Sequence, residues 1–68
     1  MPSKYPVLTS EEVVCRLANH GFVFVSQKGS HRKYRKEDRV VIVPMHTEIA
    51  RGTLRSILLQ ANMAIEDF

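Results

Sequence analysis

The sequence predicts a single α+β domain in which two helices cover one face of a three-stranded antiparallel sheet. Two segments carry apolar residues at helical spacing, and between them lie three β-rich segments separated by short turns. A chain of 68 residues with 44% hydrophobic residues forms one domain, 1–68, with one thin core. Because each apolar stripe needs a partner, both helices are expected on the same face of the sheet.

The first helix is expected to begin near Ser10 and to end near His20. Thr9 and Glu12 are spaced as a capping box, in which each side chain accepts a hydrogen bond from the backbone of the other residue. Gly21 supplies the left-handed residue that commonly stops a helix. The apolar residues at helical spacing are Val13, Val14, Leu17 and Ala18.

Three strands are predicted after this helix, at residues 22–27, 31–36 and 39–43. Residues 29–30 are Gly-Ser, which favours a two-residue type II′ turn that sets Lys28 opposite His31 and Val25 opposite Tyr34. Glu37-Asp38 forms the next turn. Phenylalanine and valine alternate through residues 22–25, so the sequence leaves open which face of the sheet the helices cover.

A loop at residues 45–50 leads to a second amphipathic helix that begins between Ala50 and Thr53. Asn62 can end it in left-handed geometry, and Ile65 to Phe68 suggest one further turn. The predicted buried stripe is Leu54, Ile57, Leu58 and Ala61.

Positive charge is concentrated on the predicted hairpin. Alternation along a strand sends His31, Lys33 and Arg35 to one face, and Arg32 and Tyr34 to the other. Such a cluster suits phosphate binding, although lysines that protect a strand edge from pairing would look the same. Arg51 and Arg55 are either further phosphate contacts or a solvated pair. Six of the ten Lys and Arg residues lie between residues 28 and 39, namely Lys28, Arg32, Lys33, Arg35, Lys36 and Arg39.

His31 is the candidate catalytic residue because it follows a tight turn and lies among cations. An imidazole can act as general base or acid, and cations can stabilise a pentavalent phosphate. By itself a lone histidine at a turn is more often an ordinary surface residue. His20 is expected to cap the first helix, and His46 lies in a loop that could approach His31.

The remaining composition argues against several other classes. The single cysteine, Cys15, cannot form an intramolecular disulfide and is expected to be a buried thiol. No short-range ligand pair suggests a metal site, so neither metal nor another cofactor is expected. The longest apolar run is four residues, which predicts neither a membrane span nor a signal peptide and therefore a cytoplasmic protein.

Four segments together resemble the HicA family, also called YcfA-like, over nearly the whole chain. They are Gly21-Phe22, Gln27-Lys28-Gly29-Ser30-His31, Val41-Ile42-Val43-Pro44-Met45-His46 and Gly52-Thr53-Leu54-Arg55-Ser56-Ile57-Leu58.

The resemblance implies a double-stranded-RNA-binding-like α-β-β-β-α fold and a toxin that cleaves messenger RNA. It also implies a HicB antitoxin that binds and blocks the toxin, and it places the catalytic histidine at His31. The expected function is therefore a metal-independent endoribonuclease with His31 as general base or acid. The second proton carrier is left open among Tyr34, Lys33, His46 and water. The predicted RNA-binding residues are Lys28, Gly29, Ser30, Arg32, Lys33, Tyr34 and Arg35.

Two other functions fit the same sequence. A non-catalytic module of this fold would hold duplex RNA by its shape and leave it intact. Alternatively, the chain serves mainly as a partner for an acidic protein segment that covers the basic face or adds a strand. The concentration of charge on the hairpin rather than at the start of the last helix counts against the first of these.

Overall fold

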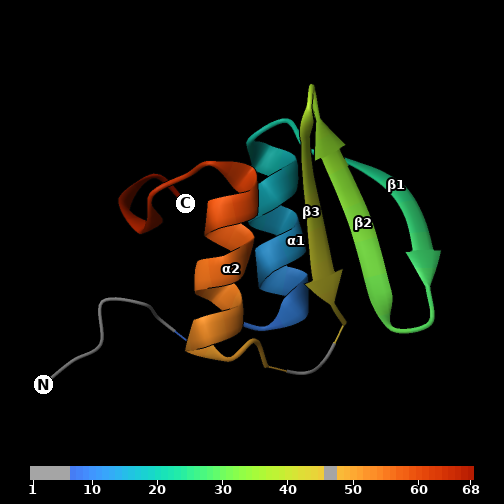
Figure 1. Ribbon diagram of the computed structural model, residues 1–68. Coiled ribbons are helices and arrows are strands. Elements are labelled where there is room, and N and C mark those ends of the chain that lie inside the picture. The colour runs from blue at the N-terminus through green and yellow to red at the C-terminus, as the bar shows by residue number, and fades with distance from the viewer. Residues whose placement is uncertain (1–6, 46–47) are drawn as a thin grey trace, which may run out of the picture.

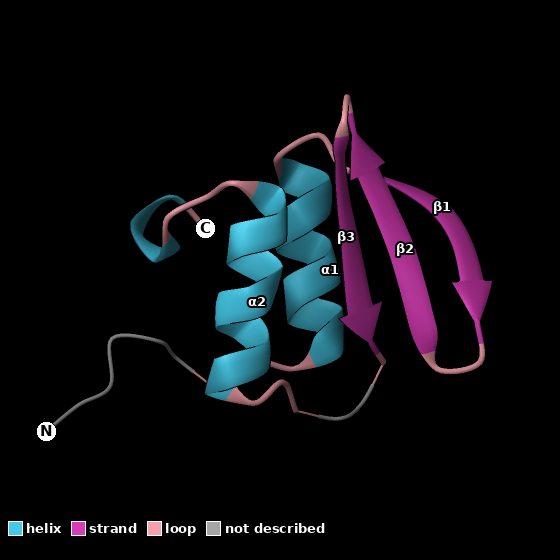
Figure 2. Cartoon of the chain, viewed as in Figure 1, coloured by secondary structure: helices cyan, strands magenta, loops and turns pink. Residues whose placement is uncertain are grey.

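The computed structural model describes residues 7–45 and 48–68 and confirms the predicted α-β-β-β-α order (Figure 1). The three strands form one antiparallel sheet in the order β1-β2-β3. Both helices lie on the same side of this sheet, close to β3 and away from β1 (Figure 2). The elements are α1 (Ser10–Asn19), β1 (Val23–Lys28), β2 (His31–Lys36), β3 (Arg39–Pro44), α2 (Arg51–Ala61) and a short 3-10 turn (Ile65–Asp67).

Local hydrogen bonds fix both ends of α1, as the sequence predicts. The Glu12 backbone N–H donates to the Thr9 hydroxyl at 3.1 Å, and the Thr9 N–H donates to the Glu12 carboxylate at 3.0 Å. At the other end Gly21 has a φ of 91°, and the Phe22 N–H donates to the Leu17 carbonyl at 3.0 Å. This left-handed stop turns the chain directly from α1 into β1.

Replacing Thr9 with alanine is expected to lower the free energy of unfolding by about 1 kcal/mol, because α1 loses its N-cap. Hydrogen bonds to the Glu12 carboxylate, first from the Thr9 backbone N–H and then from the Thr9 side chain, hold the pKa of Glu12 below its usual value. A carboxylate whose pKa is lower in the folded state than in the unfolded state stabilises the fold when the pH is above its unfolded pKa. This stabilisation is lost as the pH falls through the folded-state pKa. Only the share of the Thr9 side chain is lost in the variant, because the backbone N–H remains, so thermal unfolding should show a melting difference at neutral pH that narrows in acid without vanishing. Ser56→Ala, in the exposed interior of α2, is the control and should not destabilise.

The core lies between the two helices and one face of the sheet, here called the inner face. Tyr34, Val41 and Val43 are buried on this face, with exposed fractions of 5% or less. The opposite, outer face carries the residues that alternate with them, among them His31, Lys33 and Ile42. The helices contribute Val13, Leu17, Leu54, Ile57, Leu58 and Ala61 to the core, which confirms the stripe predicted for α2.

The prediction that Val25 lies opposite Tyr34 is wrong, because a β-bulge interrupts β1. Phe24 pairs with Tyr34 and Ser26 pairs with Lys33, so Val25 is an extra residue between them. The bulge shifts the alternation by one residue. It puts Phe24 beside the Tyr34 ring, with ring centroids 5.9 Å apart, and leaves Ser26 on the outer face beside Lys33.

In addition to the core packing, two hydrogen bonds connect α2 and the segment before it to the rest of the chain. The Ile49 N–H donates to the Leu8 carbonyl at 2.7 Å, which ties together the segments that precede the two helices. The Gln60 side chain accepts the Ile42 N–H at 2.9 Å, so a residue of α2 satisfies a backbone donor on β3. The helix begins after Ala50 without a side-chain cap and ends at Asn62 with a φ of 56°.

The expectation that Cys15 is buried is also wrong, because its side chain is exposed. Val13 and Leu17 are four residues apart and face the core, whereas Cys15 lies halfway between them, about 200° around the helix from either. Ala18, one of the apolar residues at helical spacing, is also exposed, because it lies about 100° or more around the helix from both Val13 and Leu17. His20 is the C-cap residue as expected, and its ring stacks on Phe68 at 6.3 Å.

Candidate functional site

A concavity of about 640 Å³ opens on the outer face at the closed end of the β1–β2 hairpin. It brings together five of the eight predicted site residues and adds two that were not predicted. The lining residues are Ser26, Lys28, Gly29, Ser30, His31, Lys33 and Ile42.

The turn that carries this end of the site is held in place from two sides. Gly29 has a φ of 59° whereas Ser30 does not have a positive φ, which matches the predicted type II′ turn. The Gln27 side chain donates to the Gly29 carbonyl at 2.9 Å, and the Met45 N–H donates to the Ser30 carbonyl at 2.6 Å. A Cβ added to Gly29 would meet no atom within 4 Å, so the turn is open to an approaching ligand.

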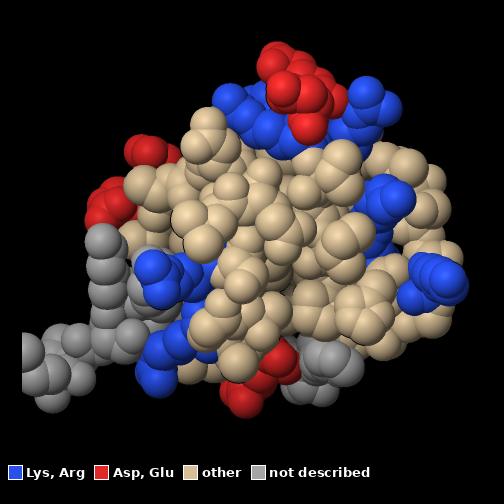
Figure 3. Space-filling view, in the orientation of Figure 1, with Lys and Arg blue, Asp and Glu red and all other residues tan. Residues whose placement is uncertain are grey.

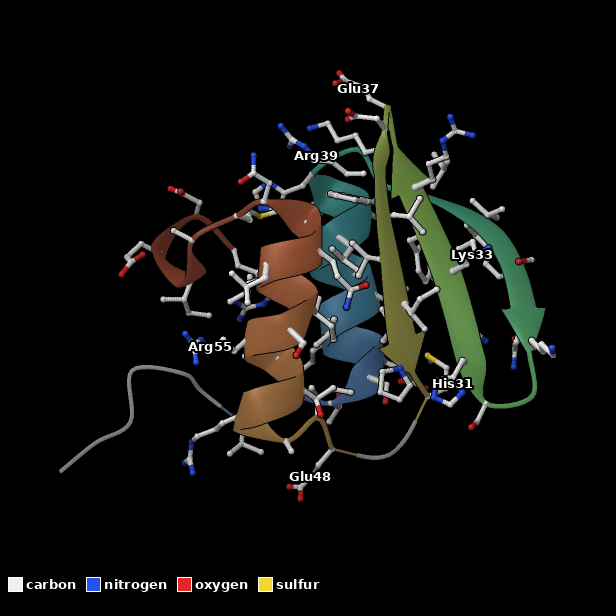
Figure 4. All side chains as sticks on the ribbon, in the orientation of Figure 1. His31, Lys33, Glu37, Arg39, Glu48 and Arg55 are labelled. Carbon is white, nitrogen blue, oxygen red and sulfur yellow. The ribbon has the colours of Figure 1, made fainter. Side chains whose placement is uncertain are left out.

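His31 lies at the start of β2 with a lysine on either side. Lys28 is its direct cross-strand partner, and Lys33 is the next residue of β2 on the same face. Cβ atoms of directly opposed residues are about 4.5–5.5 Å apart, so the imidazole and the Lys28 ammonium group can reach one ligand atom. Figure 4 shows His31 at the turn and Lys33 further along β2. All three side chains are exposed, which suits a solvated anionic ligand.

Arg32 and Tyr34 are separated from His31 by the sheet. They share the face opposite His31, as alternation predicts, and the structure shows that this is the inner face; the Arg32 Nε donates to the Gln27 side chain at 3.1 Å. Tyr34 is 5% exposed, so its ring belongs to the core. Arg35 lies on the outer face two residues beyond Lys33, and its Nε donates to the Glu37 carbonyl at 2.7 Å. His46 lies outside the described residues.

The acidic residues of the turn between β2 and β3 lie too far from His31 to neutralise the lysines beside it. Glu37 lies at the turn between β2 and β3, at the opposite end of β2 from His31 (Figure 4). Lys and Arg side chains surround the acidic residues at that end of the molecule (Figure 3). Arg55 lies on α2, on the other side of the molecule from Lys33 (Figure 4). A ligand beside His31 therefore meets Lys28 and Lys33 and not Arg55 of α2.

Ser26 and Ile42 are the two lining residues that were not predicted, although the pairing register contains the signal for both. Ser26 pairs with Lys33 across the first turn, and Ile42 pairs with the same lysine across the second. Counting outward from both turns thus places three side chains side by side on the outer face. Ile42 gives the concavity an apolar edge beside its two ammonium groups.

Among residues 7–45 and 48–68, which the structure describes, no three His, Cys, Asp or Glu side chains gather as a metal-ion site would require. Among the same residues, no helix has the length and apolar character needed to cross a membrane.

Comparison with known protein families gives one match. A family model described as the HicA toxin of bacterial toxin-antitoxin matches residues 10–63. The match runs from the first residue of α1 to just beyond α2 and therefore includes the whole concavity. A search among curated proteins found no match.

Proposed function

The chain belongs to the HicA toxin family of bacterial toxin-antitoxin systems, and on this premise we propose that it is a metal-independent endoribonuclease that cleaves messenger RNA. The observation that supports this most strongly is the placement of His31, which lies exposed between Lys28 and Lys33 in one concavity. A proton-transfer group and two cations on one face are the groups that phosphodiester cleavage needs.

In the proposed reaction the 2′-oxygen of a ribose attacks the adjacent phosphorus. His31 takes the proton of the 2′-hydroxyl as the new bond to phosphorus forms, and the bond to the 5′-oxygen breaks. The two lysines stabilise the charge that builds up on the pentavalent phosphate. The products are a 2′,3′-cyclic phosphate and a free 5′-hydroxyl, and the leaving oxygen must receive a proton. Lys33 is the proposed donor among the candidates because it shares the outer face with His31.

The other predicted binding residues take different parts in this proposal. Gly29 and Ser30 form the open turn beside the phosphate, and Arg35 extends the positive charge along β2. Arg32 connects β2 to β1 through its hydrogen bond to the Gln27 side chain, and Tyr34 packs in the core beneath the sheet. Contact of these last two with RNA stays a prediction, since a phosphate beside His31 lies across the sheet from both.

The test is cleavage of a defined single-stranded RNA by the purified protein in excess EDTA, with analysis of the new ends. We expect cleavage to persist in EDTA and to leave a cyclic phosphate and a 5′-hydroxyl. Activity that requires an added divalent ion would contradict the proposed mechanism. Intact RNA that is nevertheless bound tightly and in a salt-sensitive way would indicate a non-catalytic module instead.

Membership of the family implies a partner within a toxin-antitoxin pair. We propose that this partner is a HicB-type antitoxin in the cytoplasm, which blocks the protein by placing acidic side chains over the basic outer face. Replacing Lys28 and Lys33 together with glutamate is then expected to abolish co-purification of the two proteins. Undiminished complex formation by this variant would show that the antitoxin binds elsewhere.

A further inference from the structure

On β2 and β3 the outer face of the sheet carries two parallel rows of different chemistry. On β2 the exposed residues are His31, Lys33 and Arg35. On β3 each of them has an apolar partner directly opposite, which is Pro44, Ile42 and Val40 respectively. Val40 and Ile42 are 42% and 36% exposed, and both helices pack on the inner face. A row of one imidazole and two cations, here called the cationic row, therefore runs along an uncovered row of aliphatic side chains, here called the aliphatic row.

The spacing of the cationic row matches an extended nucleic-acid strand. Alternate residues of an antiparallel strand are about 6.8 Å apart, which is comparable with the separation of successive phosphates in an extended single strand. From His31 to Arg35 the row therefore accommodates three consecutive phosphates, with one cation or imidazole for each.

The aliphatic row lies where the bases of such a strand would fall. Cross-strand neighbours are about 5 Å apart, so a phosphate on Lys33 puts its nucleotide within reach of Ile42. Proteins commonly hold unstacked bases against aromatic or apolar side chains. The Ile42 backbone is held in turn by Gln60, which keeps this part of the edge strand in place.

We propose that single-stranded RNA lies along the outer face, with three consecutive phosphates at His31, Lys33 and Arg35 and with its bases over Ile42 and Val40. Only the assignment of the scissile phosphate to His31 rests on the proposed function. A duplex does not fit this arrangement, because its bases are stacked inside and its recognition by shape uses contacts across two grooves.

The cationic row is tested by the salt dependence of binding. The probe is a short, fluorescein-labelled, fully 2′-O-methylated oligouridine, which stays single-stranded and lacks the 2′-hydroxyl required for cleavage. Contacts from Lys28, Lys33 and Arg35 predict a slope of about −2 for the logarithm of the binding constant against that of salt. Lys33→Gln and Arg35→Gln should each reduce the magnitude of this slope by about 0.7.

The matched control is Lys36→Gln, which removes the same charge from the inner face of the same strand. The Lys36 side chain lies near Gly21 at the end of α1 and away from the two rows, so the slope should not change. Equal slopes for the Lys33 and Lys36 variants would overturn the proposal. A failure of the native protein to bind oligouridine at low salt would also overturn it. This holds even if an acidic protein is found to bind the same face.

The aliphatic row is tested by Ile42→Thr, which keeps a β-branched residue on β3. We expect at least roughly fourfold weaker binding of oligouridine, because the change replaces an ethyl group with a hydroxyl and a base loses at least one apolar carbon of contact, and no change for an abasic strand of the same length. Val7→Thr, at an exposed valine before α1, should change neither. An equal effect of Ile42→Thr on both strands, or no effect on either, would overturn the placement of the bases. These binding measurements use a strand that cannot be cleaved. They therefore test the placement of the RNA even if the protein proves not to be a ribonuclease.

Discussion

Replacing His31 with alanine is expected to reduce RNA cleavage by at least about a hundredfold while the protein stays folded. General acid–base catalysis by a positioned side chain typically contributes about 10²–10⁴ to the rate. The His31 side chain is exposed on the outer face, so its removal leaves no cavity in the core. Lys28 and Lys33 remain in the variant, so binding of the non-cleavable oligouridine should change little.

The measurement is the single-turnover cleavage rate at saturating protein, which separates the chemical step from binding. His20→Ala is the matched control, since it removes a histidine from the end of α1, where the ring stacks on Phe68 outside the concavity. Its cleavage rate should equal that of the native protein. Added imidazole should partly restore cleavage by the His31 variant, because the free base can enter the open space beside the turn. If His31→Ala cleaves as fast as the native protein, the proposed mechanism is wrong.

The parts of the fold that follow from local chemistry are predictable from the sequence. The capping box at Thr9 and the left-handed Gly21 give both ends of α1, and their hydrogen bonds lie within a few residues. The two-residue turn at residues 29–30 is equally local, and it places Lys28 opposite His31. The buried stripe of α2 follows from spacing alone, because no other face of that helix is apolar.

The parts that depend on packing between distant segments are not predictable in this way. The bulge at Val25 lets Phe24 contact Tyr34 on the inner face and leaves Ser26 on the outer face, and no local pattern in β1 requires it. The exposure of Cys15 depends on which side of α1 meets the core.

The candidate site combines both kinds of information. Alternation along β2 separates His31 from Arg32, so the sequence already indicates that one phosphate cannot contact both from the same face. The face that is free to bind depends on the burial of Tyr34 and Val41 against the helices. That burial leaves His31, Lys33 and Ile42 on the open side, and it makes the concavity a consequence of how the helices pack.

Leu54→Ala is expected to cause the largest loss of stability, about 3–5 kcal/mol. Leu54 is fully buried in α2, and truncation of a buried leucine costs both its transfer free energy and the cavity left behind. Small domains have unfolding free energies near the lower end of about 5–15 kcal/mol, so this change removes much of the total. The melting temperature should fall by at least about 10 °C, as measured by circular dichroism.

Leu59→Ala is the matched control because it makes the same substitution in the same helix at a side chain that is 70% exposed. Its effect should be below about 0.5 kcal/mol. Equal destabilisation by the two variants would contradict the orientation of α2 against the sheet. The consequence reaches the candidate site, since Gln60 of the same helix holds the Ile42 N–H on β3. Ligand binding on the outer face should therefore be lost at the lower temperature at which the Leu54 variant unfolds, whereas the Leu59 variant should retain it up to the native melting temperature.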